Sequence, residues 1–190
     1  MNKIEQAINF ATEAHAGQKR KLTDAPYILH PIEAASIASG LTADEDIICA
    51  AVLHDVVEDT GHTIDEIEKL FGKRVAELVG AETENKRANL PPEKTWQIRK
   101  EETLAHLRET EDKAVKMLWL SDKLSNMRSI YNAYLRRGDG IWCEFHEKDK
   151  QKHKWYYQSV ADALRADFNE TAAFREYETI IDLVFGDADR

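Results

Sequence analysis

Residues 49–60, CAAVLHDVVEDT, place four polar groups inside an apolar run. The apolar residues predict the end of a buried helix, where a carboxylate without a partner costs several kcal/mol. Side chains four residues apart lie about one turn apart on a helix, so His54 pairs with Glu58 and Asp55 pairs with Asp59. Imidazole and carboxylate groups suit Mn²⁺, Fe²⁺, Zn²⁺ or Mg²⁺. We therefore expect these groups to border one cavity, either a metal site that other segments complete or a polar network in the core.

A polar stripe on the helix expected at residues 112–136 is a second candidate. Its members are three, four and seven residues apart, so they share one face of an otherwise apolar helix. Such a stripe usually faces solvent, and the flanking Lys123 and Arg128 favour this interpretation. Trp119 and Leu120 come directly before it and favour the wall of a cleft instead. The stripe consists of Asp122, Ser125, Asn126 and Ser129.

The motif PYILHP brings His30 to the start of a helix after an aromatic and apolar run. A single histidine in this position commonly caps the helix or forms a hydrogen bond in the core. A ligand role for His30 is the alternative, and it requires partners from other segments.

A short cationic run, Lys19, Arg20 and Lys21, lies in a chain with a net charge of -9. One interpretation is a solvated loop. The other is recognition of phosphate, in which an arginine can also stack on a base.

The composition is that of an ordinary soluble globular protein, with 43% hydrophobic and 32% charged residues. The acidic balance argues against a nucleic-acid partner, and no apolar run approaches the roughly 18 residues that span a membrane. The N-terminal residues lack the apolar core of a signal peptide, and the two cysteines form no framework. We therefore expect a cytoplasmic protein, and a homo-oligomer is left open.

Apolar periodicity predicts helices nearly throughout, hence an all-α fold, an orthogonal multi-helix bundle. We expect a single domain over residues 1–190, with a motif-bearing core at about 4–135 and closing helices at about 149–184. Thr63 and Glu66 fit a capping box. Residues 84–95, ENKRANLPPEKT, predict a polar loop. The expected helices span residues 2–16, 30–40, 44–60, 63–72, 73–82, 95–109, 112–136, 149–166 and 170–184.

Four motifs occur in order: H-x-x-Q-x-R-K, P-Y-I-x-H-P, H-D-x-x-E-D-T and D-K-L-x-N-M-R. This ordered set resembles the HD-domain metal phosphohydrolases. Within them it is similar to the hydrolase domain of the RelA/SpoT family, including the small single-domain alarmone hydrolases of the metazoan SpoT homologue type. The resemblance runs from about residue 4 to residue 134.

The resemblance implies an all-helical HD-domain fold with one divalent metal ion, commonly Mn²⁺. It assigns the acidic pair Glu58 and Asp59 to positioning or deprotonating the attacking water. The loop that carries Lys19, Arg20 and Lys21, the basic loop, matches the segment that contacts the purine and its phosphates. Arg128 matches an arginine that pairs with a carboxylate. The implied metal ligands are His30, His54, Asp55 and Asp122, and the implied substrate contacts are Lys19, Arg20, Lys21, Asn126 and Ser129.

The implied reaction is hydrolysis of the 3′-pyrophosphate of guanosine tetra- or pentaphosphate (ppGpp or pppGpp), giving GDP or GTP and pyrophosphate. This chain departs from the family pattern around the nucleoside, for example with Ser125 in place of a common histidine. These departures leave guanosine and adenosine open as the base.

Two alternatives stand beside this activity. One is an HD hydrolase for another nucleotide: an adenosine alarmone, a deoxynucleotide or another 3′-phosphorylated nucleotide. The other is a metal-stabilised binding module without turnover, in which the acidic pair affects stability alone.

Among the remaining histidines, we expect His15 to support the basic loop, His62 to lie in a turn at the surface, and His106, His146 and His153 to face solvent.

Overall fold

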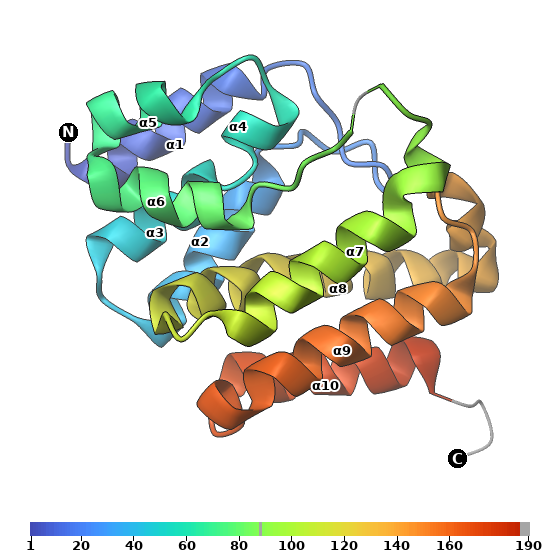
Figure 1. Ribbon diagram of the computed structural model, residues 1–190. Coiled ribbons are helices and arrows are strands. Elements are labelled where there is room, and N and C mark those ends of the chain that lie inside the picture. Colours follow the sequence, from blue (N-terminus) through green and yellow to red (C-terminus); the bar gives the residue numbers. More distant parts are fainter. Residues whose placement is uncertain (88, 187–190) are drawn as a thin grey trace.

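The computed structural model describes residues 1–87 and 89–186, and its regular structure is helical, as predicted (Figure 1). Within these ranges, extended pairing is confined to an isolated antiparallel bridge between Lys19 and Pro26. None of the described helices is both long and apolar enough to cross a membrane. The helices are α1 (Lys3–Ala14), α2 (Leu29–Leu41), α3 (Glu45–Leu53), α4 (Val56–Asp59), α5 (Ile64–Phe71), α6 (Lys73–Glu82), α7 (Pro92–Glu109), α8 (Lys113–Arg137), the 3-10 helix η1 (Gly138–Glu144), α9 (Lys150–Phe168) and α10 (Ala172–Phe185).

Helix α8 forms the centre of the bundle, because it contacts α2, α3, α6, α9, α10 and η1. In Figure 1, α1 and α3–α6 group on one side of the molecule, and α9 and α10 lie beneath α7 and α8. Residues 118–125 of α8 are all buried, which is the pattern of a helix surrounded by neighbours. This burial also encloses polar side chains, so each of them needs a partner inside the protein.

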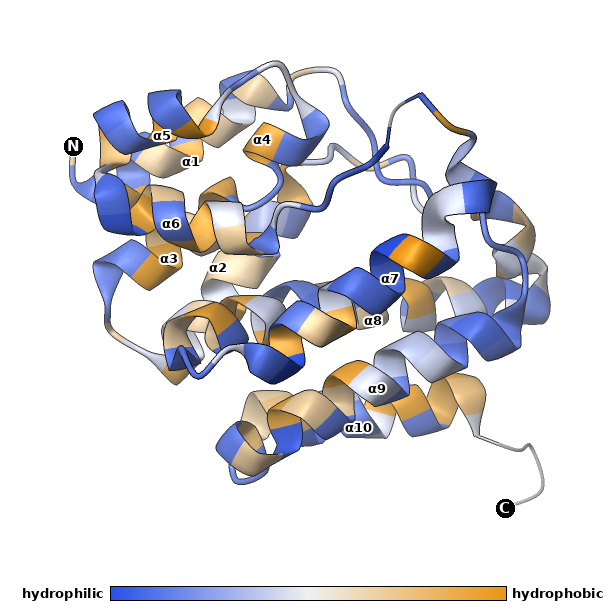
Figure 2. Cartoon of the chain, in the orientation of Figure 1, coloured by the Kyte–Doolittle hydropathy of each residue, from blue (hydrophilic) through white to orange (hydrophobic). Residues whose placement is uncertain are grey.

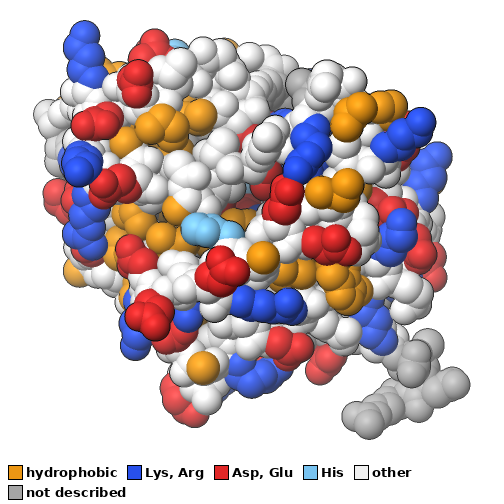
Figure 3. Space-filling model, viewed as in Figure 1, with side chains coloured by type: hydrophobic (Ala, Val, Ile, Leu, Met, Phe, Trp, Pro, Cys, Tyr) orange, Lys and Arg blue, Asp and Glu red, His pale blue; other side chains and the backbone are white. Residues whose placement is uncertain are grey.

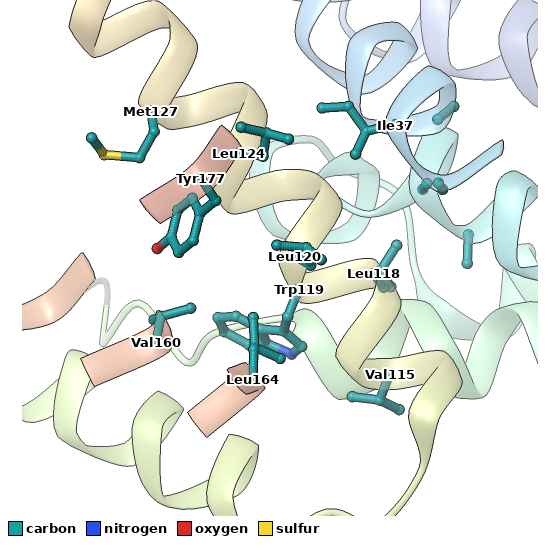
Figure 4. Packing of buried hydrophobic residues seen from close by; sticks show 14 of the residues in the cluster. Ile37, Val115, Leu118, Trp119, Leu120, Leu124, Met127, Val160, Leu164 and Tyr177 are labelled. Carbon is teal, nitrogen blue, oxygen red and sulfur yellow. The ribbon is translucent and has the colours of Figure 1, made fainter. Parts of the chain in front are cut away.

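The apolar core is built on both sides of α8 (Figure 4). Leu124 and Ile37 lie near each other where α8 meets α2, and Trp119 lies near Leu164 of α9. Tyr177 of α10 is fully buried, and its hydroxyl donates a hydrogen bond to the backbone carbonyl of Tyr157 at 3.2 Å. Tight packing on both sides fixes α8 in position and therefore fixes the polar residues that it carries.

Side-chain caps begin six of the ten described α-helices: α1, α3, α5, α8, α9 and α10. Asp44 accepts from the amide of Asp46 at the start of α3. The predicted capping box of Thr63 and Glu66 is confirmed at α5. Gly72, with φ of 93°, makes the left-handed turn between α5 and α6. The polar loop predicted at residues 84–95 is shorter than expected, because α7 already begins at Pro92, a residue type favoured in the first turn of a helix. Residue 88 lies outside the described residues, and Figure 2 draws this connection mostly in hydrophilic colours.

The single helix expected at residues 44–60 is wrong, because the chain breaks between α3 and α4 at His54 and Asp55. The imidazole Nδ1–H of His54 donates to the carbonyl of Ala51 at 2.9 Å. This side-chain bond occupies a carbonyl at the C-terminal end of α3. In a continuous helix the same carbonyl would accept from the backbone amide four residues later. The break places both side chains at a turn, so their geometry is not that of neighbours on one straight helix.

The prediction that His153 faces solvent is also wrong, whereas His106 and His146 are exposed as expected. His153 stacks on Trp142 with ring centroids 5.0 Å apart, and its Nε2 donates to the carbonyl of Glu147 at 2.9 Å. Helix α9 packs against the aromatic residues of the η1 region. His153 is therefore buried although its neighbours in the sequence are charged.

Replacing Leu118 by Ala is expected to lower the free energy of unfolding by about 2–5 kcal/mol, because this fully buried residue of α8 would leave a cavity. Urea unfolding followed by circular dichroism measures the loss. Leu135, on the same helix but 65% exposed, provides the control, and Leu135→Ala should change stability by less than about 0.5 kcal/mol. Equal losses for the two variants would contradict the central burial of α8.

Candidate active site

A cavity of about 570 Å³ lies where the basic loop, α2, the α3–α4 turn, α6, α7 and α8 meet. Every site residue predicted from the sequence lines it. The cavity therefore joins segments that are more than 100 residues apart along the chain. The predicted residues in its wall are Lys19, Arg20, Lys21, His30, His54, Asp55, Glu58, Asp59, Asp122, Asn126 and Ser129.

The four predicted metal ligands converge at the inner wall of this cavity. The Nε2 atoms of His30 and His54 are 3.2 Å apart. Oδ1 of Asp122 lies 2.9 Å from Nε2 of His30 and 3.5 Å from Nε2 of His54. Oδ2 of Asp55 lies 3.0 Å from Nε2 of His54 and 3.5 Å from Nε2 of His30. His30, His54 and Asp122 form a group whose ligand atoms lie close enough to hold one divalent ion, and Asp55 lies beside this group.

The hydrogen bonds of the two imidazoles fix which nitrogen faces the centre. Nδ1 of His54 faces the carbonyl of Ala51, a pure acceptor, so this nitrogen carries the hydrogen. The hydroxyl of Ser125 donates to Glu33 at 2.7 Å and therefore accepts from Nδ1–H of His30 at 2.8 Å. In the neutral imidazoles both Nε2 atoms thus present lone pairs to each other and to two carboxylates. Acceptors in contact require a positive charge between them, which a proton on His54 or a divalent cation supplies, and the set of nitrogen and oxygen atoms suits the cation.

Burial and the neighbouring charges shift the pKa values of the titratable groups in the site. Burial opposes a charged imidazole, but the carboxylates of Asp55 and Asp122 outweigh it and raise the pKa of His54. Burial instead dominates at His30 and lowers its pKa. The pKa of Asp122 is held well below its usual range, because the nearby Lys123 and both imidazoles outweigh the effect of burial. Asp122 is therefore an anion at neutral pH, as a metal ligand must be.

The acidic pair, Glu58 and Asp59, lies one turn beyond the metal-ligand group. Oε2 of Glu58 accepts from the backbone amide of Glu84 at 3.0 Å, and burial followed by the charge of Asp55 raises the pKa of Glu58. The hydroxyl of Tyr27 lies 2.7 Å from Asp55 and 3.0 Å from Asp59. Tyr27 thus links a predicted ligand to the acidic pair and restricts the orientation of both carboxylates.

The H-x-x-Q motif anchors the basic loop beside this pair. The imidazole of His15 and the side-chain oxygen of Gln18 are 2.9 Å apart, and the amide of Gln18 donates to the carbonyl of Asp59 at 2.9 Å. The expected supporting role of His15 is confirmed by these contacts.

Three of the predicted substrate contacts form one cluster at the outer part of the cavity. The guanidinium of Arg20 donates to Asn126 at 3.0 Å and to Ser129 at 3.2 Å. Arg20 also lies over the ring of Tyr27, 5.7 Å from its centroid. Arg20 therefore faces the polar stripe of α8, whereas Lys19 and Lys21 are exposed. Arg128 points elsewhere and pairs with Glu176 and Glu33, in agreement with the structural role that the resemblance implied.

The solvent-facing interpretation of the α8 stripe is wrong for its first residues. Asp122 is 4% exposed, and Lys123 and Ser125 are buried as well. The flanking lysine, which favoured solvent in the sequence, instead pairs with the carboxylate of Asp122 inside the protein. Packing of α8 on all sides, which periodicity alone does not reveal, accounts for this result.

Sequence reasoning missed several residues of the cavity wall. Glu84 binds Arg99 at 2.9 Å and Lys100 at 2.7 Å, so it ties α7 to the connection that holds Glu58. Glu82 follows buried Val79 by three residues, so helical spacing could have placed it on the inner face of α6. The missed residues that line the cavity are Tyr27, Glu82, Glu84, Lys86, Arg99, Lys100 and Lys123.

Comparison with known proteins identifies the class. The model of the HD domain family matches residues 7–146, and the chain belongs to this family. Its all-helical bundle is the HD-domain fold that the resemblance implied. A solved structure of a metazoan ortholog of SpoT, described as hydrolysing ppGpp, superposes with a TM-score of 0.79 at 27% identity, covering 98% of this chain and 97% of that one.

Relatives in sequence carry related names. Guanosine-3′,5′-bis(diphosphate) 3′-pyrophosphohydrolase MESH1 of Danio rerio is 39% identical over 128 residues, which are 66% of this chain and 67% of the relative. The guanosine-3′,5′-bis(diphosphate) 3′-pyrophosphohydrolase of Aquifex aeolicus (strain VF5) is 41% identical over 128 residues, 67% of this chain. The present chain spans only 18% of the length of the Aquifex protein.

Replacing Asp122 by Asn is expected to abolish high-affinity Mn²⁺ binding, because an amide supplies neither the charge nor the second oxygen of the carboxylate. Isothermal titration calorimetry with Mn²⁺ measures the loss, and circular dichroism verifies the fold. Asp162→Asn is the matched control, since Asp162 is exposed on α9. Unchanged Mn²⁺ affinity in a folded Asp122→Asn variant would remove Asp122 from the ligand set.

Proposed function

We propose that this chain is a metal-dependent hydrolase that removes the 3′-pyrophosphate from guanosine tetra- or pentaphosphate (ppGpp or pppGpp), with Mn²⁺ as its ion. One observation carries the proposal: a single cavity combines a metal-ligand group, an acidic pair and a rim of cations. A pyrophosphate ester needs all three, because its charge must be neutralised while water attacks phosphorus.

The ligand group would hold the cation through His30, His54, Asp55 and Asp122. When bound, a divalent cation polarises a phosphoryl oxygen and lowers the pKa of water. The chain itself then has to orient the nucleophile and remove its proton. Glu58 is suited to this role, because the backbone amide of Glu84 fixes one of its oxygens and its raised pKa improves it as a proton acceptor.

Cations around the cavity suit a highly charged substrate in an otherwise acidic protein. Lys19, Arg20 and Lys21 line the cavity from the basic loop, and Lys86 of the α6–α7 connection lines it while pairing with Glu58 and Asp59. Figure 3 shows Lys and Arg interspersed with Asp and Glu over one face of the molecule, so that basic charge does not dominate this face. A concentration of cations in the cavity would therefore select an anionic ligand locally.

The outer part of the cavity suits the nucleoside. Arg20, Asn126 and Ser129 offer hydrogen-bonding groups there, next to the apolar side chains of Leu22 and Ile130. A mixed apolar and polar wall is what a purine nucleoside requires, since the base is stacked while its edges and sugar form hydrogen bonds. The names of the Danio and Aquifex relatives support a guanosine bis(diphosphate) as this nucleoside.

A turnover panel with Mn²⁺ tests the substrate. We expect pyrophosphate and GDP from guanosine tetraphosphate, quantified by ion-exchange chromatography and ³¹P NMR. The adenosine analogue, a deoxynucleoside monophosphate and free pyrophosphate serve as competing substrates. Turnover of the adenosine analogue or the deoxynucleotide alone would replace the guanosine proposal, and binding of Mn²⁺ without turnover of any substrate would favour the binding module.

Combining Glu58→Gln with Asp59→Asn is expected to lower kcat by about 100-fold or more, the usual effect of losing a general base, while Mn²⁺ affinity stays measurable. The rates come from initial-velocity measurements of pyrophosphate release. Asp65→Asn, a change of an exposed carboxylate on α5, is the control. A double variant that loses stability but keeps the kcat of the native protein would show that the pair is structural.

A further inference from the structure

Glu82 is a buried carboxylate that the proposed reaction does not use. It ends α6, is 6% exposed, and neither of its oxygens has a hydrogen-bond partner among the described residues. A buried charge without compensation is costly, so its position calls for an explanation.

Glu82 lines the main cavity together with the metal-ligand group. Its Oε1 is 4.0 Å from the ammonium nitrogen of Lys123. That ammonium also pairs with Oδ2 of Asp122, while Oδ1 of Asp122 faces the imidazole of His30 at 2.9 Å. Lys123 is held in place by the ring of Trp119, 4.3 Å from the ring centroid. A line of charges therefore runs from Glu82 through Lys123 to a predicted metal ligand.

A second cavity of about 270 Å³ adjoins the first beside this group of charges. Glu82, Glu84 and Arg99 line both cavities. Buried atoms without partners occur on Glu82, Nε of Arg99 and Nε1 of Trp119, and all three residues line the second cavity. Burial and the charge of Asp122 raise the pKa of Glu82 to about 8, so its carboxyl is mostly ionised only above that pH.

The charges determine what Glu82 does to the site. Lys123 keeps Asp122 in one orientation, but its positive charge also opposes a divalent cation on the other side of that carboxylate. The carboxylate of Glu82, when ionised, offsets this charge and leaves the contact between Lys123 and Asp122 intact. The chain thereby keeps a buried lysine next to a cation site without weakening the site.

We propose that Glu82 is a positioning residue that strengthens divalent-metal binding at His30, His54, Asp55 and Asp122 by neutralising Lys123, the residue that orients Asp122. The inference rests on the metal site of the proposed function. It adds a residue outside the ligand set that determines the affinity of this site for its ion.

Mn²⁺ binding, measured by calorimetry without any nucleotide, tests the proposal. Because burial and the charge of Asp122 raise the pKa of Glu82 to about 8, the titrations are made anaerobically near pH 8.5, where the wild-type carboxyl is mostly ionised. Glu82→Gln is expected to weaken Mn²⁺ binding by about tenfold, as is usual for residues that support metal ligands. Glu82→Asp retains the charge and should recover most of this loss.

Glu102→Gln is the matched control. Glu102 also lines the second cavity, but it is exposed and pairs with Arg87, so the same neutralisation there should leave Mn²⁺ affinity within about twofold of wild type. Thermal unfolding in the absence of metal shows whether each variant folds.

A double-mutant cycle with Lys123→Met tests whether Glu82 affects Mn²⁺ affinity through Lys123. In that background, Glu82→Gln should change Mn²⁺ affinity by less than about twofold, because the charge that it offsets is absent. Equal factors in both backgrounds, or unchanged affinity of Glu82→Gln in the native background, would overturn the inference. If Lys123→Met does not fold, equal losses for Glu82→Gln and Glu82→Asp would overturn it. Wild-type protein that binds no Mn²⁺ would overturn the metal site as well.

Discussion

The constraint on which this structure depends is the meeting of four hydrogen-bond acceptors at the buried inner wall of the main cavity. The Nδ1 atoms of His30 and His54 are used by Ser125 and a backbone carbonyl, so their Nε2 lone pairs face each other and two carboxylates. Such a group is stable only around a positive charge. It is also rigid, since each member is fixed from behind by a hydrogen bond or an ion pair, as the supporting contacts of metal sites generally are.

Much of the surrounding fold serves to hold these four atoms. Residues 118–125 of helix α8 are packed on all sides, so the helix delivers Asp122 to the interior instead of the surface. The break between α3 and α4 turns His54 and Asp55 toward the same point. Glu84 joins α7 to the acidic pair, using its backbone amide for Glu58 and its carboxylate for Arg99 and Lys100. The cavity wall is therefore a continuous network of charged contacts.

The distribution of charge explains how an acidic protein can accept an anionic substrate. The net charge of -9 describes the whole chain, whereas the cavity gathers cations from the basic loop and from the α6–α7 region. Beside the metal-ligand group, Lys123 and Glu82 add a further buried pair. Membership of the HD domain family and the named relatives agree with a phosphate-ester substrate for such a site.

The sequence by itself determined the helical fold class, most helix boundaries and the ordered motifs, because helical periodicity, caps and turn residues act over a few positions. The site residues that the motifs predicted all line the cavity. Only the tertiary structure decided that residues 118–125 of α8 are buried on all sides, that the helix before Asp59 breaks at His54, and that Lys123, Glu82 and His153 are interior. These outcomes depend on which helices pack against which face. That choice is made by contacts between residues distant in sequence, and periodicity within one helix carries no information about it.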